Sequence, residues 1–302
     1  MYIGDGKSKD EKSPDDGEDD NVMSSNRLSH VMLRVPDVDA TVDYWVAKGA
    51  TVKQRNKSPK AGGGETAFVA LGNGKADQID SCFALEITFL PNPDDEEPVA
   101  PVRGNGLAYL GTSMLLDFQN NLMGAAAGEK IAKEGEAAEP NGIEVRRVAS
   151  GPGDYFARLC LRPKPLAKDD AAAVNGDREG ENNALSSLEI TEQFYTKVLG
   201  MRVVASDIDL LCLRYKGGGF GVSTALVFST EDGDPSSDDE FVMGNMLDHL
   251  VIGTPSVQEA ADALKETDEG RKAMFMEPTS MFGTTVLGIT DPNGYTIYLA
   301  EN

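Results

Sequence analysis

The sequence predicts an α+β fold built from repeated units. The only two histidines of the chain, His30 and His249, each lie on a short apolar segment that directly precedes a helical pattern. Related patterns of strand, helix and further strands recur four times along the 302 residues. Recurrence of this kind indicates one supersecondary unit used several times. Strand-rich units that contain one helix each are typical of α+β proteins.

The four units, called modules below, are separated by glycine-rich and polar stretches. Apolar alternation predicts the strands, and apolar spacing of three and four residues predicts the helices. The first module is expected to contain a strand at 28–35, a helix at 39–47 and strands at 50–55, 66–71 and 82–90. The second is expected to contain a strand at 107–116, a helix at 122–137 and a strand at 143–148. The third is expected to contain a helix followed by a strand within 190–204, and strands at 210–215 and 224–228. The fourth is expected to contain a strand at 246–252, a helix at 258–264, and a turn and terminal strand at 291–299.

Polar segments outside these patterns divide the chain. Residues 1–25 are acidic and poor in apolar side chains, which predicts a disordered tail. A second acidic stretch at 164–183 predicts a flexible insert, and residues 231–240 form a third polar segment. The expected domains are therefore 27–163 and 184–302, with two modules in each.

Net charge and hydropathy exclude two classes of partner. The chain carries 28 basic and 50 acidic residues, a net charge of −22, which repels phosphate backbones and argues against nucleic acid. No apolar run reaches the length of a membrane span. We expect a small-molecule ligand and a monomer, with an assembly partner for the acidic segments as the open alternative.

The cysteines indicate a reducing compartment. Cys82, Cys160 and Cys212 are scattered through apolar stretches without paired spacing, as expected of buried thiols. The N-terminus has no signal-peptide pattern. We therefore expect an intracellular protein, in the cytoplasm or an organelle lumen.

Four short motifs in a fixed order resemble one known superfamily. They are His30-Val-Met-Leu-Arg-Val35, Ala84-Leu-Glu-Ile-Thr88, Phe194-Tyr195 followed by Val198-Leu-Gly-Met201, and Asp291-Pro-Asn-Gly-Tyr295. Together they resemble the vicinal oxygen chelate (VOC) superfamily and, within it, the two-domain glyoxalase I (lactoylglutathione lyase) proteins. The resemblance implies four βαβββ modules paired into two half-open barrels, with a divalent metal ion where two modules face each other.

The resemblance also implies positions for the metal ligands. The first and second ligands fall on His30 and Glu86 of the first module. The ligand from the partner module falls on Tyr109 if that partner is the second module, and on His249 if it is the fourth. The fourth ligand of glyoxalase I, a glutamate that is also the catalytic base, falls on Tyr298 in the fourth module.

The strand at 155–161 has two interpretations from sequence. It can close the second module, which places Arg158 at that module's fourth-ligand position, or it can open the third module. If the first module pairs with the second, the site contains His30, Glu86, Tyr109 and Arg158. It would bind metal poorly, because a cationic arginine cannot bind a cation. Pairing the first module with the fourth instead gathers His30, Glu86 and His249, which suits a divalent ion such as Zn, Ni, Mn or Fe. We therefore expect that pairing, with one candidate metal site.

Two further positions concern the substrate. Arg34 lies on the same strand face as His30 and, by the resemblance, would bind a substrate carboxylate; an ion pair with a nearby acidic residue is equally consistent with its position. Leu90 and Asn245 replace an asparagine and an arginine that contact glutathione in glyoxalase I. Lactoylglutathione lyase activity therefore does not follow from the resemblance.

Two functions remain open from the sequence. The first is a metal-dependent lyase or isomerase that acts on a small oxygenated or thiol-adduct substrate, with Tyr298 at the catalytic position. A phenol is a poor general base at neutral pH, which predicts weak activity with a hemithioacetal. The second is a glyoxalase-like protein without catalysis or metal that binds a small ligand or acts as a scaffold.

Overall fold

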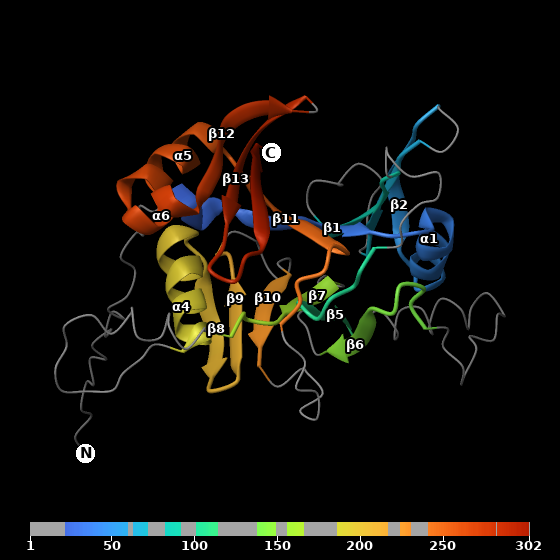
Figure 1. Cartoon of the computed structure of the whole chain (residues 1–302), viewed down its shortest axis with the longest axis horizontal. Coiled ribbons are helices and arrows are strands. Elements are labelled where there is room, and N and C mark those ends of the chain that lie inside the picture. Colours follow the sequence, from blue (N-terminus) through green and yellow to red (C-terminus); the bar gives the residue numbers. More distant parts are fainter. Residues whose placement is uncertain are drawn as a thin grey trace, which may run out of the picture.

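The protein is a mixed α+β structure with two β-sheets, as the sequence predicts. The computed structural model describes residues 22–59, 63–71, 82–91, 101–113, 138–148, 156–165, 186–216, 224–230, 241–281 and 283–301. In Figure 1 the smaller sheet lies below the larger one, and helices α1 and α5 lie at opposite ends of the larger sheet. Among the described helices, none is long and apolar enough to cross a membrane.

The larger sheet combines the first and fourth modules. Its eight strands are ordered β12-β13-β14-β11-β1-β4-β3-β2. The first module contributes β1 (Arg27–Arg34), α1 (Val38–Ala47), β2 (Thr51–Lys57), β3 (Glu65–Ala70) and β4 (Ala84–Phe89). The fourth contributes β11 (Leu247–Thr254), α5 (Val257–Glu266), α6 (Asp268–Ala273), β12 (Met274–Met281), β13 (Thr284–Thr290) and β14 (Thr296–Glu301).

The smaller sheet combines the second and third modules. Its six strands are ordered β6-β5-β7-β10-β9-β8. They are β5 (Leu107–Ser113), β6 (Glu144–Val148), β7 (Phe156–Leu161), β8 (Arg202–Asp207), β9 (Leu210–Arg214) and β10 (Ala225–Ser229). The third module also carries α4 (Ser187–Gln193), which continues into the π-helix η3 (Phe194–Val198).

The two sheets are assembled by the same rule. The opening strands of two modules pair antiparallel at the centre, β1 with β11 and β5 with β7. Each opening strand also pairs parallel with the last strand of its own module, as β1 does with β4 and β11 with β14. The expected pairing of the first module with the fourth is therefore confirmed. Each sheet draws strands from both 27–163 and 184–302, so neither of these expected domains contains a complete sheet.

Strand β7 opens the third module. It pairs parallel with β10 and antiparallel with β5, which are the positions of an opening strand. The alternative, in which this strand closes the second module and Arg158 takes the fourth-ligand position, is wrong. That position belongs to β6, which pairs parallel with β5. Local patterning could not separate the two because strand pairing is fixed by contacts distant in sequence.

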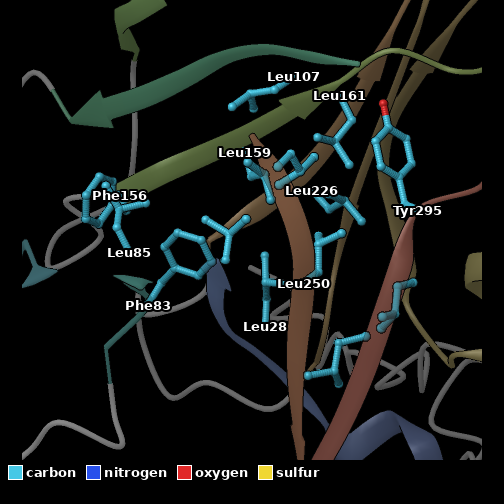
Figure 2. Close-up of a cluster of buried hydrophobic side chains, with 14 of the residues drawn as sticks. Leu28, Phe83, Leu85, Leu107, Phe156, Leu159, Leu161, Leu226, Leu250 and Tyr295 are labelled. Atoms are coloured by element: carbon cyan, nitrogen blue, oxygen red, sulfur yellow. The ribbon is translucent and has the colours of Figure 1, made fainter. Parts of the chain in front are cut away.

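The main hydrophobic core joins the two sheets. Figure 2 shows leucines of β1 and β11 facing leucines of β5, β7 and β10. The fully buried Trp45 of α1 packs against Phe156 of β7, with ring centroids 5.4 Å apart. On β1, Val31 and Leu33 belong to this core, whereas His30 lies on the other face. Core packing therefore turns the candidate site residues away from the interface between the sheets.

The helices begin at the polar residues that the sequence offers. Asp37 and Ser256 accept hydrogen bonds from backbone amides in the first turns of α1 and α5. Ser186 and Glu189 form a complete capping box at the start of α4. Caps of this kind each contribute about 1 kcal/mol.

Several expected segments lie outside the described residues. These are residues 1–21 of the tail, 166–183 of the acidic insert, the expected helix at 122–137 and the polar segment at 231–240. The last residues of the expected tail do adopt structure, because Val22–Ser25 form a 3-10 turn and Met23 is buried. Residues 22–25 of the expected disordered tail are therefore ordered.

Two segments, 102–105 and 242–245, cross each other just before the opening strands β5 and β11. The amide of Val102 donates to Asn245 Oδ1 at 2.7 Å, and the amide of Val242 donates to Asn105 Oδ1 at 2.8 Å. Gly104 and Gly244 lie at the crossing with φ of +64° and +68°. A Cβ atom on Gly244 would lie 2.4 Å from the carbonyl oxygen of Val102. Only glycine fits here, because the backbone is left-handed and the neighbouring segment is in contact.

We expect Gly244→Ala to lower the free energy of unfolding by roughly 2–5 kcal/mol, the sum of a left-handed alanine and a backbone clash. Gly283→Ala is the matched control, because Gly283 also has a positive φ of +88° but a Cβ there would meet nothing within 4 Å. Its cost should be about 1–2 kcal/mol. Urea denaturation of both variants measures the difference, and equal costs would contradict the crossing argument.

The turn Asp291–Tyr295 fastens the fourth module to the smaller sheet. Asp291 accepts hydrogen bonds from the amides of Asn293 and Tyr295 and from the Tyr195 hydroxyl of η3. The Tyr295 hydroxyl lies 2.7 Å from the carbonyl oxygen of Gly106. Burial raises the pKa of Asp291 to about 6, although these hydrogen bonds act against the shift.

This buried carboxyl predicts a pH-dependent stability. Its pKa is higher in the folded state than the ordinary value of 3.8, so its contribution is fully present below about pH 4 and is lost as pH rises through about 6. Relative to Asp291→Asn, the wild type should lose roughly 3 kcal/mol of unfolding free energy between pH 4 and pH 8. Asp262→Asn, at an exposed position, is the control. Its unfolding free energy should change with pH in the same way as that of the wild type. If the difference in unfolding free energy between the wild type and Asp291→Asn did not change with pH, the prediction would be contradicted.

Candidate metal centre

Three candidate ligands from two modules meet on the larger sheet. One ligand atom each of His30, Glu86 and His249 lies within 4.8 Å of the other two. His30 Nε2 and Glu86 Oε2 are 3.3 Å apart. The three side chains are 20%, 16% and 14% exposed, so they are largely dehydrated but accessible from the open face of the sheet. Within the described residues, no other group of His, Cys, Asp or Glu side chains has this spacing.

Strand register brings these ligands together. Met32 of β1 pairs with Glu86 of β4 on one side and with His249 of β11 on the other. His30 lies two residues before Met32, and alternate residues of a strand share a face. The three side chains therefore surround one point on the sheet, although they come from distant parts of the sequence.

Local contacts fix the ring of His30. Its Nδ1 lies 3.2 Å from the hydroxyl of Ser29, while its Nε2 faces Glu86. Phe68 of β3 packs edge-on against the imidazole, with ring centroids 5.3 Å apart. These neighbours leave Nε2 directed at the point where the ligands converge.

His249 is oriented by a carboxylate that the sequence analysis did not identify. Asp248 Oδ1 lies 2.7 Å from His249 Nδ1, so the Nε2 atom is left to bind a ligand. Arg34 forms an ion pair with the other oxygen of Asp248. Burial alone would raise the pKa of Asp248, but the contacts with His249 and Arg34 outweigh it and hold that pKa below its ordinary value. Of the two roles considered for Arg34, the structure shows the ion pair; substrate binding stays a prediction.

We expect Asp248→Asn to weaken metal binding by about 10- to 100-fold, because a hydrogen-bonded carboxylate orients a ligating imidazole and increases its basicity. The three ligand side chains are untouched by this change. Competition against a chelator of known affinity measures the effect. Asp262→Asn removes an exposed carboxylate on α5 and should leave the affinity unchanged. An unchanged affinity in Asp248→Asn would contradict the orienting role.

Tyr298 lies beside the three ligands. It is on β14, where it pairs with Val251 of β11. Its ring contacts the imidazole of His249 edge-on, with centroids 4.8 Å apart, and the ring of Phe275 is also edge-on to it, with centroids 6.1 Å apart. The residue therefore borders the site, at the position that the sequence analysis gave it. A catalytic role for it stays a prediction.

The chemistry of this group suits a divalent cation. Two imidazole nitrogens and one carboxylate oxygen are a common set for zinc, iron, nickel and manganese, and three protein ligands leave coordination positions for water or substrate. His30, Glu86 and His249 would hold such an ion.

The fold has relatives among solved structures. Glyoxalase I from Zea mays superposes with a TM-score of 0.61 at 21% sequence identity, over 92% of this chain and 92% of that protein. The chain has the fold of glyoxalase I. A candidate dioxygenase from Bacillus subtilis superposes with a TM-score of 0.55 at 11% identity, over 91% of this chain and 84% of that protein. No protein-family model and no curated protein matches the sequence.

The structure places the two residues that stand where glyoxalase I has glutathione contacts. Asn245 bonds to the backbone of Val102 in the crossed segments, so it holds the modules together. Leu90 follows β4 and is 48% exposed. The role of Asp248 could have been suspected from the sequence, since an acidic residue directly precedes the histidine. All three cysteines are free; Cys160 and Cys212 are buried as expected, whereas Cys82 is half-buried.

Proposed function

We propose that this protein is a metal-dependent enzyme of the glyoxalase type, a lyase or isomerase of a small oxygenated or thiol-adduct substrate. The observation that carries the proposal is the convergence of His30, Glu86 and His249 within 4.8 Å. A divalent ion bound there would polarise a substrate carbonyl and stabilise negative charge on the adjacent oxygen. The glyoxalase I fold supports the proposal at the level of the superfamily.

The other residues of the site set the reaction's limits. Asp248 holds the ring of His249, and Arg34 holds Asp248. The sequence resemblance assigns Tyr298 to the position of the carboxylate base of glyoxalase I, and a phenol removes a carbon-bound proton poorly at neutral pH. We therefore expect slow turnover of a hemithioacetal by the wild type. A substrate whose proton is more acidic, or one that needs no proton abstraction, would suit the site better.

A second function is favoured by the ligand set itself. Two histidines and one carboxylate with open positions are typical of oxygenases that use non-haem iron(II). Because Tyr298 stands in place of a carboxylate as fourth ligand, the set of two histidines and one carboxylate is kept. An oxygenase would consume dioxygen, whereas a lyase or isomerase would not.

The test begins with metal content. Purified full-length protein is analysed for bound metal, stripped with a chelator and reloaded separately with nickel, zinc, manganese and iron(II). Hemithioacetal turnover and oxygen uptake with an oxygenated aromatic substrate are then measured for each form. Stoichiometric metal with isomerisation supports the lyase or isomerase, and iron-dependent oxygen uptake supports the oxygenase. Absence of metal affinity would overturn both and favour the non-catalytic binding protein.

A further inference from the structure

The smaller sheet carries arginines at the positions of the metal ligands. Gly111 of β5 pairs with Arg146 of β6 and with Arg158 of β7, just as Met32 of β1 pairs with Glu86 and His249. Arg146 therefore corresponds to Glu86, and Arg158 corresponds to His249. Two cationic groups replace a carboxylate and an imidazole at the equivalent place on this sheet.

Tyr109 holds these two arginines together. It corresponds to His30, because it pairs with Cys160 two residues beyond Arg158. The guanidinium carbon of Arg146 lies 4.2 Å from the centroid of the Tyr109 ring. Burial raises the pKa of Tyr109, and a hydrogen bond from Arg158 opposes that shift. One guanidinium thus stacks on the face of the ring while the other contacts its hydroxyl.

Small and apolar side chains form the floor around these cations. Tyr109, Cys160, Cys212, Ala225 and Val227 are buried together as a separate cluster from the main core. Gly111 lets the Arg158 side chain pack close to β5, since a Cβ there would lie 2.9 Å from Arg158 Cβ.

The electrostatics of this face are cationic. Arg158 and Arg214 both act to lower the pKa of Cys212, against a larger rise from burial. Glu144 neutralises part of this charge, because it accepts two hydrogen bonds from Arg146 at 2.6 and 3.0 Å. Three arginines near one buried cluster are notable in a chain whose net charge is −22.

We propose that this face of the smaller sheet binds a small organic anion, with Arg146 and Arg158 contacting its carboxylate or phosphate oxygens. A planar guanidinium donates two parallel hydrogen bonds to either group. Arg146 stacks on Tyr109 and already donates to Glu144, so an anion would be bound by its remaining N–H groups together with Arg158. The site shares no residue with the metal centre, so the proposal is independent of the proposed function.

The experiment is isothermal titration of the full-length protein with succinate and, separately, with inorganic phosphate, both at constant ionic strength. We expect saturable binding of at least one probe; the tighter one assigns the site to carboxylates or to phosphates. Arg158→Gln and Arg146→Gln should weaken that binding by about 10- to 100-fold, the effect of a lost charge-assisted hydrogen bond. Arg271→Gln is the matched control, since Arg271 is paired with Asp268 on α6, and it should bind like the wild type.

Three results would overturn the proposal. They are no saturable binding of either probe, equal weakening by Arg271→Gln, and loss of binding in His249→Ala, which would place the anion at the metal centre. Arg146 lies on an edge strand, so its substitution is the one expected to preserve folding. Arg158→Lys, which keeps the charge without the planar group, should bind more weakly than the wild type while melting at the same temperature.

Discussion

Replacing His249 with alanine should abolish stoichiometric binding of a divalent metal ion. A site of three protein ligands loses a third of its donors with this change, and each ligand of a zinc site accounts for several kcal/mol of affinity. We expect the dissociation constant to rise on the order of 10²- to 10³-fold or more. His30→Ala and Glu86→Gln should have effects of the same order, because the three ligand atoms surround one point.

The matched control for Glu86→Gln is Glu277→Gln. Glu277 lies on β12 and pairs with the exposed Lys265, far along the sheet order from β4. Metal analysis of the purified variants and titration of the stripped proteins give the comparison. If His249→Ala retained metal while His30→Ala lost it, the two histidines would not share an ion, and the single site would be wrong.

Much of the fold was predictable because each module carries its own local signals. The helices near 39–47 and 258–264 and the strands at 66–71, 210–215 and 246–252 follow from apolar periodicity, and capping residues mark the helix starts. These signals depend on neighbours in the sequence. Local propensity and core packing agree in these segments, which is why simple pattern reasoning succeeds there.

The module arrangement was less accessible, because it depends on contacts between segments far apart in the chain. Chemistry supplied the missing information for the larger sheet, where pairing His30 with His249 gives a better ligand set than pairing it with Arg158. For β7 no such argument was available. Its apolar sequence suits the end of one module and the start of the next equally well, and only pairing with β10 decides between them.

Side-chain roles were predictable only where the family pattern named a residue. His30, Glu86 and His249 were identified in advance, and the structure brings them together. An ion pair of Arg34 was one of two expected roles, but its partner Asp248 was not identified, because a β-bulge between β1 and β11 displaces Asp248 from regular alternation. An irregularity of this kind alters which side chains share a face, and a two-residue period cannot anticipate it.

Replacing Tyr298 with glutamate should increase hemithioacetal isomerisation by about 10²- to 10⁴-fold, the usual contribution of a positioned general base. Tyr298 contacts the imidazole of His249 and lies on β14, beside β11. The sequence resemblance assigns the fourth ligand to this residue. A carboxylate there would be close enough to the metal ligands to take a proton from a bound substrate. The rate is measured by thioester formation with the metal-loaded variant at neutral pH.

Tyr298→Gln is the matched control, because glutamine has nearly the shape of glutamate but cannot accept a proton at neutral pH. A gain in Tyr298→Glu that is absent in Tyr298→Gln identifies proton transfer as the missing function. Equal gains would show instead that removing the ring opens the cavity. No gain in either variant, with metal retained, would mean that substrate binding limits turnover, as expected if the exchanges at Leu90 and Asn245 have removed the affinity for glutathione adducts. The lyase hypothesis for that substrate would then be wrong, and a cavity adapted to another ligand would be favoured.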